Sequence, residues 1–114
     1  MKRAEHQPTT ELLVYAGIFC KVWTVADRGT VLPQHAHRWG HISLLVAGKV
    51  HAWQGDDYLG VFTAPAMIKI PPDTPHRFET ITNNVAIACL HNADHLDADG
   101  QPLVEREHAI DMED

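Results

Sequence analysis

The sequence predicts an all-β domain of the sandwich or barrel class. Short apolar, β-branched or aromatic runs recur from Leu12 to His91, and turn residues separate them every eight to twelve positions or so. Patterns with the period of a helix are scarce along the same stretch. The 114 residues suit one domain that buries its own core but are too few for two. We therefore expect a single domain over 1–114, with one site.

The expected strands follow from alternating or continuous apolar runs bounded by turn residues. In chain order they cover 12–15, 19–25, a short extended piece at 34–37, 41–46, 49–54, 67–70, 77–81 and 85–91. The turns between them are rich in glycine, proline, aspartate and asparagine: Asp27-Arg28-Gly29, Ala47-Gly48, Gly55-Asp56-Asp57, Pro71-Pro72-Asp73 and Asn83-Asn84. The last pair can take the positive φ of a tight hairpin. The barrel core is expected at about 12–91.

Charge is concentrated at the C-terminal end. The chain has a formal net charge of −6, and eight acidic residues against Arg106 alone fall in the tail 94–114. The remaining residues are close to neutral and contain no basic patch with interleaved aromatic residues. Nucleic acid is therefore not an expected partner.

Location is predicted from what the sequence lacks. No apolar run approaches the ~18 residues of a membrane span, and the N-terminal residues have no apolar stretch of the secretory type. Cys20 and Cys89 lie far apart in apolar contexts that suit reduced thiols better than a disulfide. We expect a cytoplasmic protein with no membrane partner.

Four histidines have the spacing of metal ligands: His35, His37, His41 and His76. Three fall in Gly29-x5-His35-x-His37-x3-His41-x6-Gly48, and the fourth in Pro71-x-Asp73-x-x-His76. In a strand, His35 and His37 would share one face about 6.6 Å apart. A straight strand would carry His41 about 20 Å beyond His35, so the chain must bend within Arg38-Trp39-Gly40.

A chain with nine histidines places some in turns and on strand surfaces by chance, and this explanation suits any single one. The joint spacing favours a ligand set for one divalent transition metal per chain, namely iron, manganese, nickel, copper or zinc. Four neutral imidazoles leave the full +2 charge on the ion. The expected partner is therefore a small-molecule substrate that is anionic and able to chelate.

The two motifs resemble those of the cupin superfamily, G-x5-H-x-H-x3,4-E-x6-G and G-x5-P-x-G-x2-H-x3-N. The resemblance covers roughly Gly29 to Thr80. It implies a double-stranded β-helix, or jelly roll, with the metal inside the barrel mouth on His35, His37, His41 and His76. The chain departs from the pattern where His41 replaces glutamate, Pro65 and Asp73 replace glycines, and Thr80 replaces asparagine.

Three further residues have conditional roles. Alternation from His76 makes Phe78 point inward, and Ile87, Cys89 and His91 share one face. If that face lines the barrel, Phe78 and Cys89 are candidate pocket residues and His91 a candidate acid/base; otherwise His91 ends its strand in water at the rim. The segment 41–46 is apolar on both faces, and a homodimer would cover the outer one.

Three functions remain in competition. The first is a dioxygenase acting on a small enolisable or chelating carbonyl compound. The second is a redox-silent isomerase or lyase on acidic sugars. The third is a non-catalytic module that binds a metal or ligand.

Overall fold

The protein was analysed as a computed structural model, which describes residues 7–34 and 40–93. In chain order the strands are β1 (Thr9–Tyr15), β2 (Ile18–Val25), β3 (Val31–Gln34), β4 (His41–Ala47), β5 (Lys49–Gln54), β6 (Asp57–Thr63), β7 (Ala66–Ile70), β8 (His76–Thr80) and β9 (Val85–Asn92). Within these residues, no helix has the length and hydropathy needed to cross a membrane.

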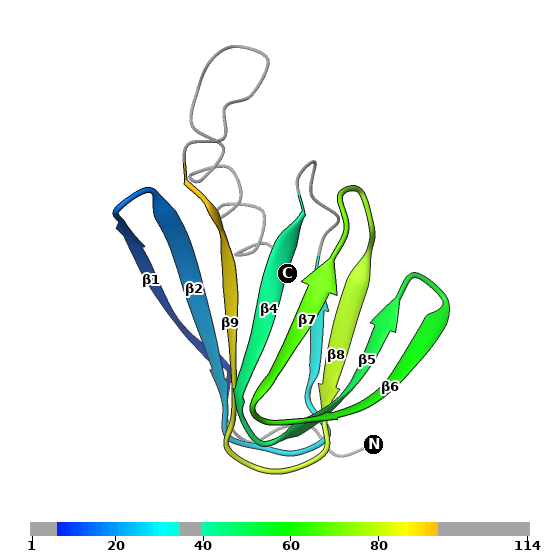
Figure 1. Ribbon diagram of the computed structural model, residues 1–114. Helices are drawn as coiled ribbons and strands as arrows, with labels where there is room; N and C mark the ends of the chain where they lie inside the picture. Colours follow the sequence, from blue (N-terminus) through cyan, green and yellow to red (C-terminus); the bar gives the residue numbers. More distant parts are fainter. Residues whose placement is uncertain (1–6, 35–39, 94–114) are drawn as a thin grey trace.

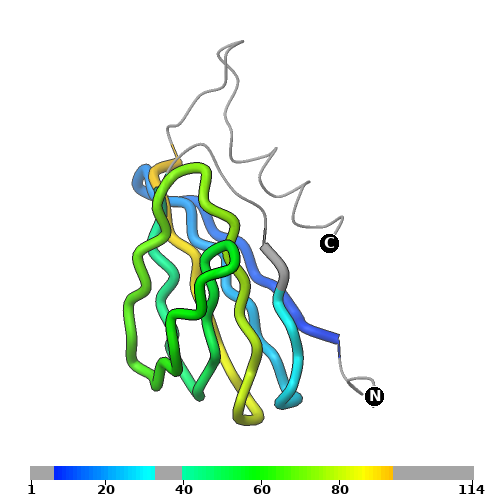
Figure 2. Tube along the Cα trace, turned by 90° about the vertical axis from the view of Figure 1, so that its right-hand side faces the viewer, coloured from blue at the N-terminus to red at the C-terminus, as the bar shows by residue number. Residues whose placement is uncertain are grey.

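The strands form two antiparallel sheets. The large sheet has the order β1-β2-β9-β4-β7, and the small sheet has the order β3-β8-β5-β6. Figure 1 shows the strands drawn together at the lower end and spread at the upper end, and Figure 2 shows the same barrel from the side. Strands adjacent in a sheet are often distant in sequence, as in a jelly roll. The all-β prediction is confirmed.

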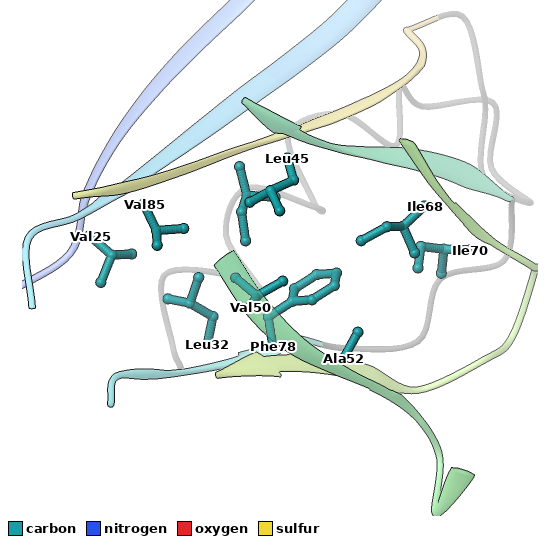
Figure 3. Close-up of a cluster of buried hydrophobic side chains, with 10 residues drawn as sticks. Val25, Leu32, Leu45, Val50, Ala52, Ile68, Ile70, Phe78 and Val85 are labelled. Carbon is teal, nitrogen blue, oxygen red and sulfur yellow. The ribbon is translucent and has the colours of Figure 1, made fainter. Parts of the chain in front are cut away.

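The core lies between the sheets, where alternate residues of both face inward. Leu45 and Ile68 from the large sheet face Val50 and Phe78 from the small sheet, and all four are buried (Figure 3). This packing follows from the period of two along each strand, which places Val50 and Ala52 inside and His51 outside. Apolar burial between the sheets therefore fixes the faces on which all other side chains lie.

One strand was not predicted, two others differ from their predicted bounds by three residues, and the remaining bounds agree to within one residue. β6 (Asp57–Thr63) was not expected, because Gly60 interrupts its apolar residues; in the structure most of its residues are exposed. Gly60 has φ +110° at a register shift between Ala52 and Trp53, so it belongs to an irregular edge pairing. β1 begins at Thr9, three residues earlier than expected. β3 occupies Val31–Gln34, whereas the expected piece covered 34–37.

The predicted turns are informative at two positions. Asn84 has φ +58°, so the expected positive φ is confirmed, but β8 and β9 belong to different sheets and the predicted hairpin at Asn83-Asn84 is wrong. Gly48 has φ +87°, and a Cβ added there would lie 2.6 Å from Cγ2 of Val85 and 2.8 Å from Oγ1 of Thr82. Both the conformation and the close packing require glycine at position 48.

Cys20 and Cys89 lie on adjacent strands and form no disulfide. Cys20 on β2 pairs with Leu90 on β9, while Cys89 pairs with Lys21, so the two thiols point to opposite faces of the large sheet. Side chains that point apart cannot form a disulfide without backbone movement.

Candidate metal centre

His41 and His76 meet at the open end of the barrel. His41 is the first residue of β4 in the large sheet, and His76 is the first residue of β8 in the small sheet. Their ring centroids lie 5.0 Å apart, with the ring planes tilted by 55°. Only 7% of His41 and 3% of His76 is exposed. Two predicted ligands thus converge from facing sheets in a buried position.

The geometry of this pair fits a shared metal ion. Imidazole nitrogens at ~2.0–2.1 Å from one ion, with ligand angles of ~90–110°, place ring centres about 4.5–5.2 Å apart. Nδ1 of His76 lies 3.2 Å from the carbonyl oxygen of Thr74. Because a carbonyl only accepts, Nδ1 carries the proton, and the lone pair is on the buried Nε2. His76 is therefore held in the tautomer that a metal ligand needs.

The other two predicted ligands, His35 and His37, lie outside the described residues, as does most of the predicted bend at Arg38-Trp39-Gly40. Among the residues at 7–34 and 40–93, no group of three or more potential ligands is found. Gly40 is described, and a Cβ there would lie 3.2 Å from the carbonyl oxygen of Ile70. Close approach to β7 is thus one reason for a glycine before His41.

Thr80 fastens the loop that precedes β3. Its hydroxyl accepts a hydrogen bond from the backbone N–H of Thr30 and donates one to the carbonyl of Asp27, both at 2.9 Å. The backbone N–H of Gly29 donates to the carbonyl of Thr80 at 2.7 Å. The residue that replaces the motif asparagine therefore ties β8, which begins with His76, to the start of the first histidine motif.

The comparisons with known proteins agree on this architecture. No protein-family model matches the chain, and no curated protein matches it in sequence. A cupin superfamily protein from Desulfitobacterium hafniense DCB-2 superposes with a TM-score of 0.66 at 12% identity, covering 81% of this chain and 83% of that one. The chain has the cupin fold.

Two other solved structures support the same conclusion. A cupin 2 conserved barrel domain protein from Salinispora arenicola CNS-205 has a TM-score of 0.66 at 18% identity, over 95% of this chain and 88% of that one. DMSP lyase DddQ from Ruegeria pomeroyi DSS-3 has a TM-score of 0.66 at 16% identity, over 80% of this chain and 49% of that one. The jelly-roll prediction is confirmed.

A further departure from the cupin pattern has a backbone explanation. Asp73, which stands where the pattern has glycine, adopts φ +55°. Aspartate tolerates this left-handed conformation better than most residues, so the turn before His76 forms without the glycine. The preceding departure, Pro65, follows a cis peptide bond from Ala64.

His91 lies on the inner face of β9, at the same end of the cupin barrel. Its ring stacks on Phe19 with centroids 4.3 Å apart and planes 16° apart, and its Nδ1 lies 2.9 Å from the carbonyl oxygen of Asn92. The ring is partly buried, and Nε2 is shielded from solvent. His91 is thus closer to the inward-facing alternative than to the water-exposed one, and its chemical role stays a prediction.

Phe78 and Cys89 both face the barrel interior, as alternation predicts. Phe78 is buried in the core, and its ring centroid lies 6.1 Å from that of His76 with the ring planes at 68°. Sγ of Cys89 lies 3.8 Å from Oγ of the buried Ser43. Phe78 forms the apolar floor beneath His76, and Cys89 belongs to a more polar wall.

Lys21 is the inward-facing residue that the sequence reasoning missed. Only 2% of it is exposed, and its Nζ lies 4.9 Å from the ring centroid of Trp23. The signal was present: in 19–25, the buried face carries Phe19, Lys21, Trp23 and Val25 at alternate positions. A lysine that alternates with three inward-facing apolar residues on one strand is predicted to be buried.

A separate open pocket of about 320 Å³ lies on the outer face of the small sheet. It is lined by His51, Trp53, Tyr58 and Glu79. Nδ1 of His51 and the hydroxyl of Tyr58 are 2.7 Å apart, and the Arg77 guanidinium lies over the Trp53 ring at 4.2 Å. These contacts tie the side chains to one another, and the pocket opens away from the His41–His76 pair.

Proposed function

We propose that the chain is a metal-dependent enzyme, of the dioxygenase type, acting on a small anionic carbonyl compound that can enolise or chelate. The observation that carries the proposal is the buried pair of His41 and His76, brought together from two sheets at the open end of a cupin fold. Two converging imidazoles, one with its tautomer set by a carbonyl, suit a transition metal better than a purely structural contact.

The proposed ligands are His35, His37, His41 and His76. In β3, Leu32 is 3% exposed and Val31 is 49% exposed, so even-numbered positions face the interior. The register of β3 with β8 runs without a shift from Val31 opposite Glu79 to Gln34 opposite His76, so β3 itself contains no bulge. For His35 and His37 to join His76, the chain has to leave this alternation after Gln34.

A bound divalent metal would supply Lewis-acid activation of a chelating substrate and, with a redox-active ion, reaction with O₂. The chain contributes position and charge. Thr74 orients the His76 ring, and Phe78 excludes water beneath it. Four neutral ligands offset none of the ion's positive charge, which favours anionic substrates. His91, at the same end of the barrel, is the proposed acid/base group.

The test combines metal analysis with O₂ consumption. Purified protein should hold one divalent transition metal per chain and consume O₂ with a member of a panel of diketones, flavonols and related chelators. Replacing His76 with alanine should abolish both signals. Bound metal without O₂ uptake across the panel would remove the dioxygenase assignment and leave the metal site standing.

A second candidate is a redox-silent lyase or isomerase on acidic sugars. One structural neighbour of this chain is named a DMSP lyase, and this name is the observation that supports a lyase as the second candidate. Turnover under strict anaerobiosis, unchanged when zinc or nickel replaces the native metal, would support this candidate against the dioxygenase.

The non-catalytic alternative makes a different prediction for His37. If the metal only organises the barrel, replacing His37 with alanine should lower the thermal unfolding temperature in parallel with metal loss. In a catalytic centre the same variant should chiefly lose metal and activity, and keep the fold.

A further inference from the structure

The open pocket on the outer face of the small sheet is lined mainly by aromatic rings. His51 and Trp53 from β5, Tyr58 from β6 and Glu79 from β8 enclose about 320 Å³. The three ring centroids lie between 5.3 and 5.9 Å apart, and each pair of ring planes is tilted by 48° or 49°. Small-molecule sites span about 300–1,000 Å³. This outer pocket therefore has the size of a site for one small ligand.

A bulge in the pairing of β5 with β6 brings the aromatic rings together. Ala52 lies opposite Gly60, so a regular register would place Leu59 opposite Trp53. The register shifts by one residue at this point, and Tyr58 lies opposite Trp53 instead. Bulges often redirect a side chain beside a functional site. Here the bulge replaces an aliphatic cross-strand neighbour of Trp53 with an aromatic one.

Contacts among the side chains position the rings of the outer pocket. Nδ1 of His51 and the hydroxyl of Tyr58 share a hydrogen bond of 2.7 Å. The guanidinium of Arg77 lies 4.2 Å from the ring centroid of Trp53. Side chains that are already held in place lose less conformational entropy when a ligand binds. The pocket is therefore partly preorganised for binding.

The lining of the outer pocket suits a ligand with a positive charge. The faces of aromatic rings attract cations within about 6 Å of the centroid, and sites of this kind recognise quaternary ammonium groups. Arg77 already places one cation over the ring of Trp53. With His51 neutral, Glu79 carries the one formal charge among the four lining side chains, and it is partly buried. Its carboxylate adds a charge of the sign opposite to that of an ammonium ligand.

We propose that the outer pocket binds a small organic cation with an alkylated ammonium group. The rings of His51, Trp53 and Tyr58 contact the ammonium group, and Glu79 balances its charge. The site is separate from the proposed metal centre, because Val50 and Ala52 face the core while His51, between them, faces outward. The alternative is that Trp53 and Tyr58 only stabilise the edge strand β6 as a cross-strand pair.

The test compares choline with its neutral isostere dimethylbutanol, in which a carbon atom replaces the charged nitrogen. Each compound is titrated into the isotope-labelled full chain, and NMR follows the indole N–H resonance of Trp53, which is identified by its loss in Trp53→Leu. Choline should shift this resonance and bind about 10-fold or more tightly than the alcohol, because only choline carries the charge that the rings and the carboxylate attract.

Variants of the lining assign the binding to this pocket. Tyr58→Leu should weaken choline binding by about 5-fold or more, and Tyr58→Phe, which keeps the ring, should retain most of it. Tyr15→Leu removes a tyrosine that is 77% exposed on β1 and should have no effect. Glu79→Gln should weaken choline binding by about 2–5-fold, as for a partly exposed ion pair, and leave the alcohol unchanged. Glu11→Gln, on β1, is the matched control.

Three results would overturn the cation site. The first is the absence of a shift with choline, and the second is equal binding of choline and the alcohol. The third is choline binding that survives in both Tyr58→Leu and Glu79→Gln. Methyl glucoside serves as a neutral ligand that can also stack on aromatic rings. If it shifts the Trp53 resonance at lower concentration than choline does, the pocket is not a site for cations.

Discussion

The imidazole rings of His41 and His76 lie 5.0 Å apart, although 35 positions separate the two residues in the chain. The contact exists because β4 and β8 belong to facing sheets and both begin at the open end of the barrel (Figure 1). The contact brings together two ligands that are distant in the sequence, as the proposed four-histidine centre requires.

The first prediction concerns metal affinity. Replacing His41 or His76 with alanine should weaken binding of a divalent transition metal by more than about 100-fold, since loss of a ligand's hydrogen-bond partner alone costs about 10–100-fold. Metal content after dialysis measures the effect. His51→Ala is the matched control, because His51 lies on the outer face beside Tyr58 and should keep its metal. Equal loss in all three variants would contradict the assignment.

The second prediction concerns the Thr80 hydroxyl. Thr80→Val should lower the free energy of unfolding by about 1–3 kcal/mol, because the Thr30 N–H and the Asp27 carbonyl lose a buried partner. Urea denaturation measures the change, and Thr80→Ser should recover most of it. The exposed Thr63 provides the control, where valine should have little effect. Equal stabilities for the Thr80 and Thr63 variants would remove the anchoring role.

The third prediction separates two costs at Gly48. Alanine there should destabilise the protein by about 2–4 kcal/mol, from backbone strain and from the clash with Val85 and Thr82. Gly55 has φ +60° with no heavy atom within 4 Å of an added Cβ, so Gly55→Ala carries the strain alone, about 1 kcal/mol. Identical costs in the two variants would show that the contact with Val85 is unimportant.

The fourth prediction is the homodimer, which stays a proposal. The outer face of the large sheet exposes apolar side chains on neighbouring strands, including Ile42 and Val46 on β4 and Met67, 76% exposed, on β7. We propose that a second copy covers this face, since one flat patch can pair with itself about a two-fold axis. Light scattering should give a dimer for wild type and a monomer for Val46→Glu. A monomeric wild type at micromolar concentration contradicts it.

The sequence predicted the structure correctly where a feature depends on local rules, such as strand alternation or a residue that tolerates positive φ. Alternation correctly placed Phe78 and Cys89 inside, and Asn84 correctly marked a left-handed turn. β6 was missed because Gly60 interrupts its apolar residues. Its pairing with β5 also includes a bulge, which the sequence pattern does not reveal. Lys21 was missed because a charged residue in a strand usually marks the solvent-exposed face. It alternates with Phe19 and Val25, however, and therefore points to the interior.

The departures from the cupin motifs also separate what local spacing predicts from what depends on tertiary structure. Spacing alone could predict that His41 and His76 converge, but not that Thr80 would replace the motif asparagine by bonding to the loop at Asp27 and Thr30. Such a bond joins residues about 50 positions apart, and only tertiary structure brings them together. The open pocket beside His51 is likewise invisible in the sequence, because it forms from three strands.

We propose that His41 and His76, with His35 and His37, bind one metal ion at the open end of the cupin barrel. Diffraction from crystals of Mn²⁺- or Zn²⁺-loaded protein, collected at the metal absorption edge, tests it most directly. We expect one anomalous peak per chain, at about 2.0–2.3 Å from ring nitrogens of both His41 and His76. A loaded protein whose peak lies elsewhere, or whose two rings face each other with no ion between them, would contradict it.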